Sequence, residues 1–306
     1  MWVYELVLFH HLTRMLFIYN FNQFYRCMKK KDLIKLTEYY FKSFEAQYIR
    51  MLNADSKESI HDTRVSIKRI MALINFFEEL KICSKKEIKK ISSAFEIFEV
   101  AGMYREYQLF LELLDVYKNK LNHKFDNVHR SLIRMLNIYK SEFQHLQGNI
   151  SFIEIYKNLE SIKDEINKTC DKKVSNGLKK YIESRVLYCH KYAAAPNLSK
   201  YLHEIRRTLK HLRFILEQIN PYKKKDIQEI ICFKDLKEVE LMLGDWHDLD
   251  LFLQTILDYI ERKKGSYDLT IYNQLINAIK TDQVKMEQKI KFALVPVIHV
   301  FMLLIR

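Results

Sequence analysis

Residues 202–217 read LHEIRRTLKHLRFILE, and this stretch combines two opposite faces on one helix. Since an α-helix turns by about 100° per residue, four basic side chains lie within about 80° of His203. They are Arg206, Arg207, Lys210 and Arg213. Leucine and isoleucine occupy the opposite face, at positions 209, 212, 215 and 216. The pattern predicts an amphipathic helix whose apolar face enters a core and whose basic face stays open.

An earlier stretch, HDTRVSIKRI at 61–70, repeats the basic part of this pattern. Its residues His61, Arg64 and Lys68 recur in the same order and with the same spacing at positions 203, 206 and 210. Arg69 extends the basic face of the first copy. An ordinary solvated helix face mixes charges of both signs, because opposite charges one turn apart stabilise it. A nearly acid-free face therefore favours an anionic partner.

Two glycine segments keep the same interval along the chain as the two basic motifs. Gly102 stands in AGMYREYQLF and Gly244 in LGDWHDLDLF. The residues that follow also correspond, Arg105 with His247 and Glu106 with Asp248. A constant interval across two separate motifs predicts an internal duplication. The glycines are expected to allow a bend or close helix packing, and Glu106 and Asp248 to orient the basic residues through ion pairs.

The whole chain favours an all-α fold. Its 306 residues contain only 5 Gly and 3 Pro, and helical periodicity runs from end to end. We expect helices near 32–52, 59–81, 105–117, 151–170, 177–193 and 198–219, with bends at Gly102 and Gly244. DKKVSNG, at 171–177, is expected to be the clearest internal loop. One domain over 1–306 would comprise an extra N-terminal helix (1–28), a first half (29–170) and a second half (175–306). The halves would form two antiparallel helical bundles related by a pseudo-two-fold axis.

The net charge limits the classes of binding partner, and the cysteine pattern indicates the cellular compartment. The net charge of +13 suits nucleic acid, polyphosphate or an acidic membrane surface. Five scattered cysteines without a CxxC motif indicate neither a zinc site nor a disulfide framework, which fits a reduced cytoplasm. No signal peptide or membrane span is expected, because charged or polar residues interrupt the apolar N-terminus and the C-terminal apolar run is too short.

The residue types of the basic faces suit phosphate. Arginine offers a planar fork for two phosphate oxygens, lysine adds a point charge, and a nearby polyanion would favour protonated histidine. Several cations along one helix suit a linear, repeating anion better than a compact one. Two such faces opposite each other would line a groove of positive potential. Arg69 and Arg213 could instead simply be solvated.

These same residues resemble those of the CHAD family, the conserved histidine α-helical domain. HDTRVSIKRI is similar to that family's His-x-x-Arg-x-x-x-basic-basic pattern, and LHEIRRTLKHLRFILE to its longer basic motif, with Phe214 at the aromatic position and Glu217 as the acid. LGDWHD resembles its Leu-Gly-x-x-x-Asp segment. AGMYREYQLF resembles its Gly-x-x-Arg-Asp segment, although Glu106 replaces the aspartate.

The resemblance implies two helical bundles around a basic central channel that binds inorganic polyphosphate without catalysis or a cofactor. It also implies targeting to polyphosphate granules. The residues it implies at the channel are His61, Arg64, Lys68, Arg69, His203, Arg206, Arg207, Lys210 and Arg213; we add Arg105 as a candidate.

Other functions stay open at this point. The charge permits a nucleic-acid-binding protein, although no stacking platform or nucleic-acid-binding motif stands out in the sequence. A metal-dependent phosphohydrolase could use His61 and Asp62, but Glu204 replaces the aspartate in the second copy and the surrounding cations would repel a metal ion. A purely structural helical scaffold is the remaining alternative.

Overall fold

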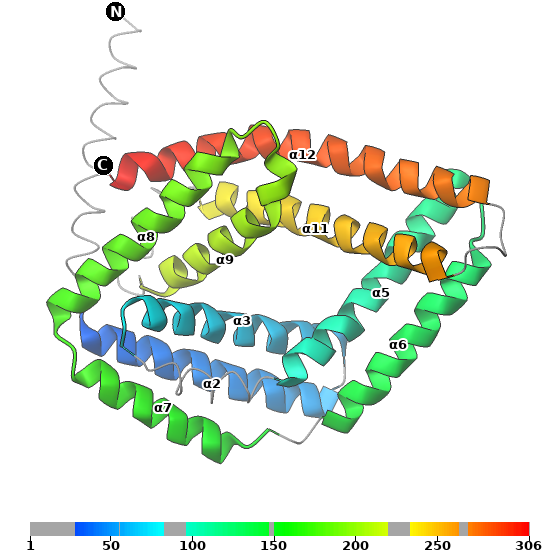
Figure 1. Ribbon diagram of the computed structural model, residues 1–306. Helices are drawn as coiled ribbons and strands as arrows, with labels where there is room; N and C mark the ends of the chain where they lie inside the picture. The colour runs from blue at the N-terminus through cyan, green and yellow to red at the C-terminus, as the bar shows by residue number, and fades with distance from the viewer. Residues whose placement is uncertain are drawn as a thin grey trace, which may run out of the picture.

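The computed structural model describes residues 28–54, 56–82, 96–146, 150–219, 233–262 and 269–305. This part of the chain contains helices and no strand, which confirms the all-α prediction (Figure 1). The helices are α2 (Lys30–Ala54), α3 (Lys57–Glu79), α5 (Glu96–Leu121), α6 (Asp126–Leu146), α7 (Phe152–Asn167), α8 (Asp171–Ala193), the 3-10 helix η1 (Leu198–Tyr201), α9 (Leu202–Ile219), α11 (Phe233–Arg262) and α12 (Leu269–Ile305).

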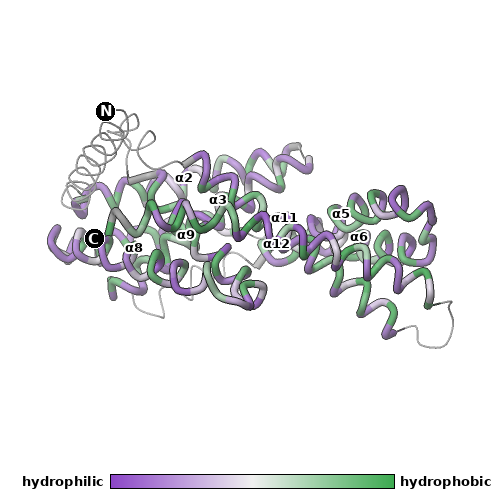
Figure 2. The backbone as a smooth tube through the Cα atoms, turned by 90° about the horizontal axis from the view of Figure 1, so that it is seen from above, coloured by the Kyte–Doolittle hydropathy of each residue, from purple (hydrophilic) through white to green (hydrophobic). Residues whose placement is uncertain are grey.

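The helices pack into two lobes, each with its own hydrophobic core (Figure 2). The first core joins α2, α3, α7, α8 and α9 with the N-terminal parts of α5 and α11 and the C-terminal part of α12. The second core joins α6 with the remaining parts of α5, α11 and α12. Both lobes draw on both halves of the sequence, so the halves interlock instead of forming separate bundles.

The helices that carry the similar sequence motifs pack against each other. Helix α3, with the first basic motif, packs on α9, with the second, and α5, which contains Gly102, packs on α11, which contains Gly244. Helix α7 lies between α6 and α8 along the chain.

The two basic helices are held by the apolar faces predicted for them. Ser56 caps α3, and its hydroxyl accepts a hydrogen bond from the Ser59 backbone amide at 3.1 Å. In α3 the apolar positions 67, 70, 73 and 74 are buried, and in α9 so are positions 209, 212, 215 and 216. The polar faces of both helices are thereby turned away from the core.

The prediction of a loop at 171–177 was wrong, because these residues form the first two turns of α8. A glycine in DKKVSNG serves close packing there instead of a turn. A Cβ on Gly177 would lie only 2.5 Å from Cγ of Leu80, which caps the C-terminus of α3. Tertiary contact with α3 therefore overrides the local loop-forming composition.

The predicted bends at Gly102 and Gly244 were also wrong. Helix α5 runs unbroken through Gly102, and α11 through Gly244. A Cβ on Gly102 would lie 3.2 Å from Nη2 of Arg64, so this glycine makes room for a side chain of α3. Nothing lies within 4 Å of the corresponding position at Gly244.

The predicted N-terminal helix and the C-terminal apolar run differ in how far the structure describes them. The expected N-terminal helix lies almost entirely outside the described residues. The C-terminal apolar run belongs to α12, where Leu294, Ile298 and Phe301 are buried in the first core. Within the described ranges, no helix has the length and apolarity needed to cross a membrane.

A cationic pocket between the two basic helices

The four helices that carry the repeated motifs meet at one place. Helix α3 packs on α5 and α9, and α11 packs on α5 and α9. The remaining helices form an outer frame around this group, with α6, α7, α8 and α12 at the periphery (Figure 1). The fold thereby brings together the two copies of the basic motif, which lie far apart along the chain.

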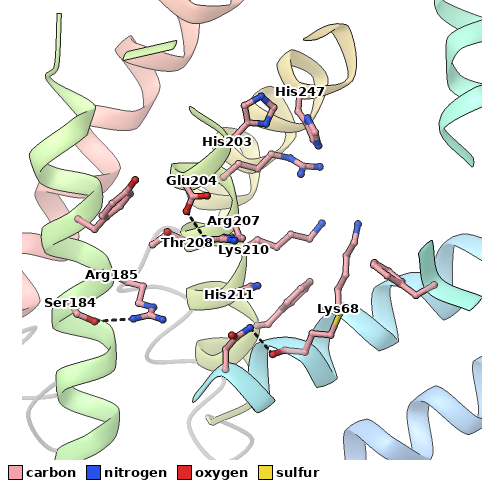
Figure 3. Close-up of a pocket in the computed structure, with 16 residues that line it drawn as sticks. Lys68, Ser184, Arg185, His203, Glu204, Arg207, Thr208, Lys210, His211 and His247 are labelled. Atoms are coloured by element: carbon pink, nitrogen blue, oxygen red, sulfur yellow. Dashed lines mark hydrogen bonds and ion pairs between the residues drawn. The ribbon is translucent and has the colours of Figure 1, made fainter. Parts of the chain in front are cut away.

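A pocket of about 670 Å³ opens at this meeting point. Lys68 of α3 and Lys210 of α9 extend toward one another, and His203 and His247 lie at one side (Figure 3). Helix α8 forms the opposite wall. Its lining includes Lys68, Asn75, Phe98, Arg185, Tyr188, Arg206, Arg207 and Lys210.

The two lysines are poorly solvated cations. Burial, and then the neighbouring charge of Lys210, lowers the pKa of Lys68 well below its ordinary value. Burial, together with Arg206, lowers the pKa of Lys210 from 10.5 to about 8. Neither ammonium forms an ion pair with an acid among the described residues. An approaching anion would therefore restore a favourable environment for both charges.

Two arginines from the repeated motifs share this environment. Burial lowers the pKa of both Arg64 and Arg206, and the largest opposing effects come from Glu106 for Arg64 and Asp248 for Arg206. Nε of Arg64 is buried without a hydrogen-bond partner in the described part of the chain. The Arg64 guanidinium thus keeps hydrogen-bonding capacity that the described part of the protein does not use.

The rings of two phenylalanines lie against the cations. The ring of Phe98 lies 5.5 Å from the guanidinium carbon of Arg64 and 5.6 Å from Nζ of Lys68. The ring of Phe214 lies 5.9 Å from Nζ of Lys210. A cation over an aromatic face is attracted by the ring quadrupole, which contributes about 0.5–1 kcal/mol or more. The rings hold the positive groups in place without neutralising them.

The acids Glu106 and Asp248 lie close enough to affect this cluster electrostatically. Burial raises the pKa of Glu106, and the charge of Arg64 is the largest effect in the opposite direction. Burial likewise raises the pKa of Asp248 and is opposed chiefly by Arg206. Within the described chain neither acid makes an ion pair of 4.0 Å or less, so both act on the arginines through longer-range charge.

A histidine cluster closes one side of the pocket. Nε2 of His203 lies 3.1 Å from Oδ2 of Asp250, whose other oxygen accepts a hydrogen bond from Gln283 at 3.2 Å. The His203 and His247 rings meet edge to face at 4.8 Å. Burial, and then the charge of Arg206, lowers the pKa of His247 to about 3, so this ring is neutral at physiological pH.

The sequence model of the CHAD domain family matches residues 37–257, which is well over half of the chain. The protein belongs to the CHAD family.

Solved structures agree with the fold of this CHAD domain. The crystal structure of the CHAD domain from the plant Ricinus communis is 12% identical, with a TM-score of 0.58 over 87% of this chain and 91% of that chain. PptA from Streptomyces chartreusis is 14% identical, with a TM-score of 0.59 over 88% of this chain and 98% of that chain. No curated protein matches the sequence. At these identities the structural likeness concerns the fold alone.

The predicted site residues of this CHAD domain divide into two groups. Five line the pocket, namely Lys68, His203, Arg206, Arg207 and Lys210. The others lie beside the pocket or are engaged elsewhere. Nε of Arg213 donates to both oxygens of Glu240 at 2.8 and 2.9 Å, and its pair with Glu217 completes a structural network.

The remaining predicted residues outside the pocket also have defined surroundings. Nη1 of Arg105 lies 3.4 Å from Gln108 and 3.6 Å from Glu112. The guanidinium of Arg69 lies 5.7 Å from the Phe214 ring centroid, and its Nε is buried without a partner among the described residues. His61 lies at the surface with much of its side chain exposed. Desolvation of the covered part of its ring lowers the pKa of His61.

Sequence reasoning missed several pocket residues, among them Asn75, Phe98, Arg185, Tyr188 and His211. His211 lies within the basic motif itself, next to Lys210, so its position on the helix was available as a signal. Burial lowers the pKa of His211 to about 4. Phe98 and Arg185 belong to helices outside the basic motifs, and no sequence pattern places them at this pocket.

The geometry offers little to a metal ion. Among the described residues, no group of three or more histidine, cysteine, aspartate or glutamate side chains is placed to hold one. Asp62, the acid of the phosphohydrolase hypothesis, instead pairs with Arg50 at 3.3 Å.

Proposed function

We propose that this CHAD domain binds inorganic polyphosphate and does not hydrolyse it. The observation that supports this proposal is the convergence of Lys68, Arg206 and Lys210 in one pocket, where none of them forms an ion pair of 4.0 Å or less with an acid of the described chain. Clustering like charges at a partly buried site costs stability, because each charge loses hydration and repels its neighbours. A bound polyanion would offset that cost through charge-assisted hydrogen bonds.

The repeat explains why the anion should be extended. We infer that the constant interval between the repeated motifs reflects an internal duplication, whose two copies present equivalent cations from α3 and α9 on either side of a basic channel. Arg64 lies over the same ring as Lys68, which extends the cationic row beyond the pocket itself. A chain of phosphates would meet successive cations along this row, and the protein could thereby be targeted to polyphosphate granules in the cytoplasm.

Calorimetric titration with long-chain polyphosphate at two salt concentrations tests the proposal. The wild type should bind tightly, and more weakly at the higher salt concentration, because cation–phosphate contacts release condensed counterions. Lys68→Ala/Arg206→Ala should weaken binding at least about 100-fold, since each lost charge-assisted hydrogen bond is worth about 1.5 kcal/mol or more. Lys289→Ala/Lys291→Ala removes the same charge from exposed positions of α12 and serves as the matched control.

Three outcomes would contradict the proposal. Equal binding by the two double variants would mean that bulk charge, not this pocket, holds the ligand. Equal competition by DNA at the same phosphate concentration would favour a nucleic-acid-binding protein. Phosphate release from polyphosphate after addition of Mg²⁺ or Mn²⁺ would indicate a phosphohydrolase.

A further inference from the structure

The two ends of the pocket differ in how their charges are compensated. At the α8 end, Arg185 pairs with Glu79, and Nη2 of Arg207 lies 2.6 Å from Oε2 of Glu204. At the other end, Lys68 extends from α3 toward Lys210, and neither has an acidic partner in the described chain (Figure 3). One end therefore attracts an anion, whereas the other is close to electrically neutral.

Two further pocket-lining side chains, Tyr188 of α8 and Asn75 of α3, have the chemistry to contact an organic molecule. Tyr188 is half-buried and lines the pocket, and the neighbouring Tyr192 ring lies 4.8 Å from it at 54°, which restrains the tyrosine. Asn75 also lines the pocket and uses one donor on the Met71 carbonyl, at 2.9 Å. An amide has two donors and an acceptor oxygen, so Asn75 retains hydrogen-bonding capacity for a ligand.

The dimensions also suit a compact ligand. Pockets for small molecules typically enclose about 300–1,000 Å³, and they combine apolar walls with a few polar groups. This pocket has about 670 Å³ and adds the side chains of Phe98 and Met71 to its cations. A simple phosphate chain would use the cationic end and leave Tyr188 of α8 and Asn75 of α3 without a role.

We propose that this pocket also binds a nucleoside polyphosphate, with its phosphates at Lys68, Arg206 and Lys210 and its nucleoside against Tyr188 and Asn75. The inference rests on the proposed function, because the same cations hold the phosphates of both ligands. The base stacks on the tyrosine ring, since every base presents an aromatic face and such stacking is largely independent of base identity. Asn75 hydrogen bonds the nucleoside.

Comparison of ATP with methyl triphosphate isolates the nucleoside contribution. Both are triphosphate monoesters of the same charge, and calorimetry without divalent cations keeps that charge equal. We expect ATP to bind about tenfold more tightly, the lower part of the range for stacking of one base on an aromatic side chain. Tyr188→Leu should remove most of the preference for ATP and leave the affinity for methyl triphosphate unchanged, and Tyr188→Phe should retain the wild-type preference.

The result that overturns the inference is ATP binding no tighter than methyl triphosphate, or an equal loss of both ligands in Tyr188→Leu with its thermal unfolding unchanged. If Tyr188→Leu does not fold, Asn75→Ala replaces it and should weaken ATP alone, about threefold or more for one hydrogen bond. Long-chain polyphosphate, measured in parallel, separates the two proposals. If polyphosphate binds and ATP shows no preference, only this inference fails; if no phosphate ligand binds, the proposed function fails as well.

Discussion

Removal of one pocket cation should stabilise the fold, and Lys210→Met is the most informative substitution. Burial beside Arg206 lowers the pKa of Lys210 from 10.5 to about 8. Since each pKa unit corresponds to about 1.36 kcal/mol, the charged lysine costs up to roughly 3 kcal/mol in the folded state at pH 7. Partial solvent screening and the lost contact with Phe214, worth about 0.5–1 kcal/mol, reduce the net gain. We expect Lys210→Met to raise the free energy of unfolding by about 1–2 kcal/mol.

The sign of this effect depends on pH. A lysine whose pKa is lower in the folded state destabilises the fold fully below the folded value and ceases to do so above the unfolded value. The advantage of Lys210→Met over wild type should therefore be greatest at pH 7 and fall below about 1 kcal/mol by pH 10. Because the two proteins are compared at each pH, the titration of groups that they share largely cancels.

Urea denaturation at pH 7 and pH 10 measures this difference. With a slope of about 3 kcal/mol/M, the midpoint at pH 7 should rise by about 0.3–0.7 M. Lys289→Met, on the exposed side of α12, is the matched control and should leave the midpoint nearly unchanged. A Lys210→Met protein that is less stable than wild type at pH 7, or equally shifted at both pH values, would refute the electrostatic reasoning. Polyphosphate should reverse the order, because it stabilises the wild type more strongly.

Two further predictions concern packing and ion pairing. Gly177→Ala should lower the free energy of unfolding by about 1–3 kcal/mol, because its Cβ would meet Cγ of Leu80 at 2.5 Å. Gly244→Ala should raise the free energy of unfolding by about 0.5–1 kcal/mol, since this helical position has open space around it. Thermal unfolding of both glycine variants checks this contrast, and a change of the same sign in both would contradict it. Arg213→Met should destabilise by about 3–5 kcal/mol, because it leaves Glu240, only 10% exposed, without its partner. The double variant Arg213→Met/Glu240→Leu should recover most of that loss of stability. If the changes in the free energy of unfolding of the two single variants simply add in the double variant, the pair does not stabilise the fold as inferred.

The helical fold could be predicted largely from periodicity and composition. The apolar faces of α3 and α9 have the helical spacing, and the structure buries them as expected. Two of the errors arose where a glycine supports packing. Gly177 and Gly102 lie inside helices against Leu80 and Arg64, and a single sequence cannot distinguish such a contact from a turn.

The candidate site shows the same limit. Lys68, Arg206 and Lys210 could be assigned to one binding face because their spacing and charge are visible along the chain. Phe98 and Arg185 could not, because their place at the pocket follows from the crossing of α5 and α8 with the basic helices. The involvement of Arg213 with Glu240 likewise depends on the packing of α9 against α11.

The interlocking of the two halves has a consequence for biosynthesis. Leu33 of α2 and Phe301 of α12 belong to the same hydrophobic core, although nearly the whole chain separates them. At about 5–20 residues per second, a ribosome makes Phe301 roughly 13–54 s after Leu33. During that interval the apolar face of α2 has left the ribosome while its last partners have yet to be made. The lobe that begins first is therefore completed last, and the nascent chain needs protection from aggregation until translation is nearly finished.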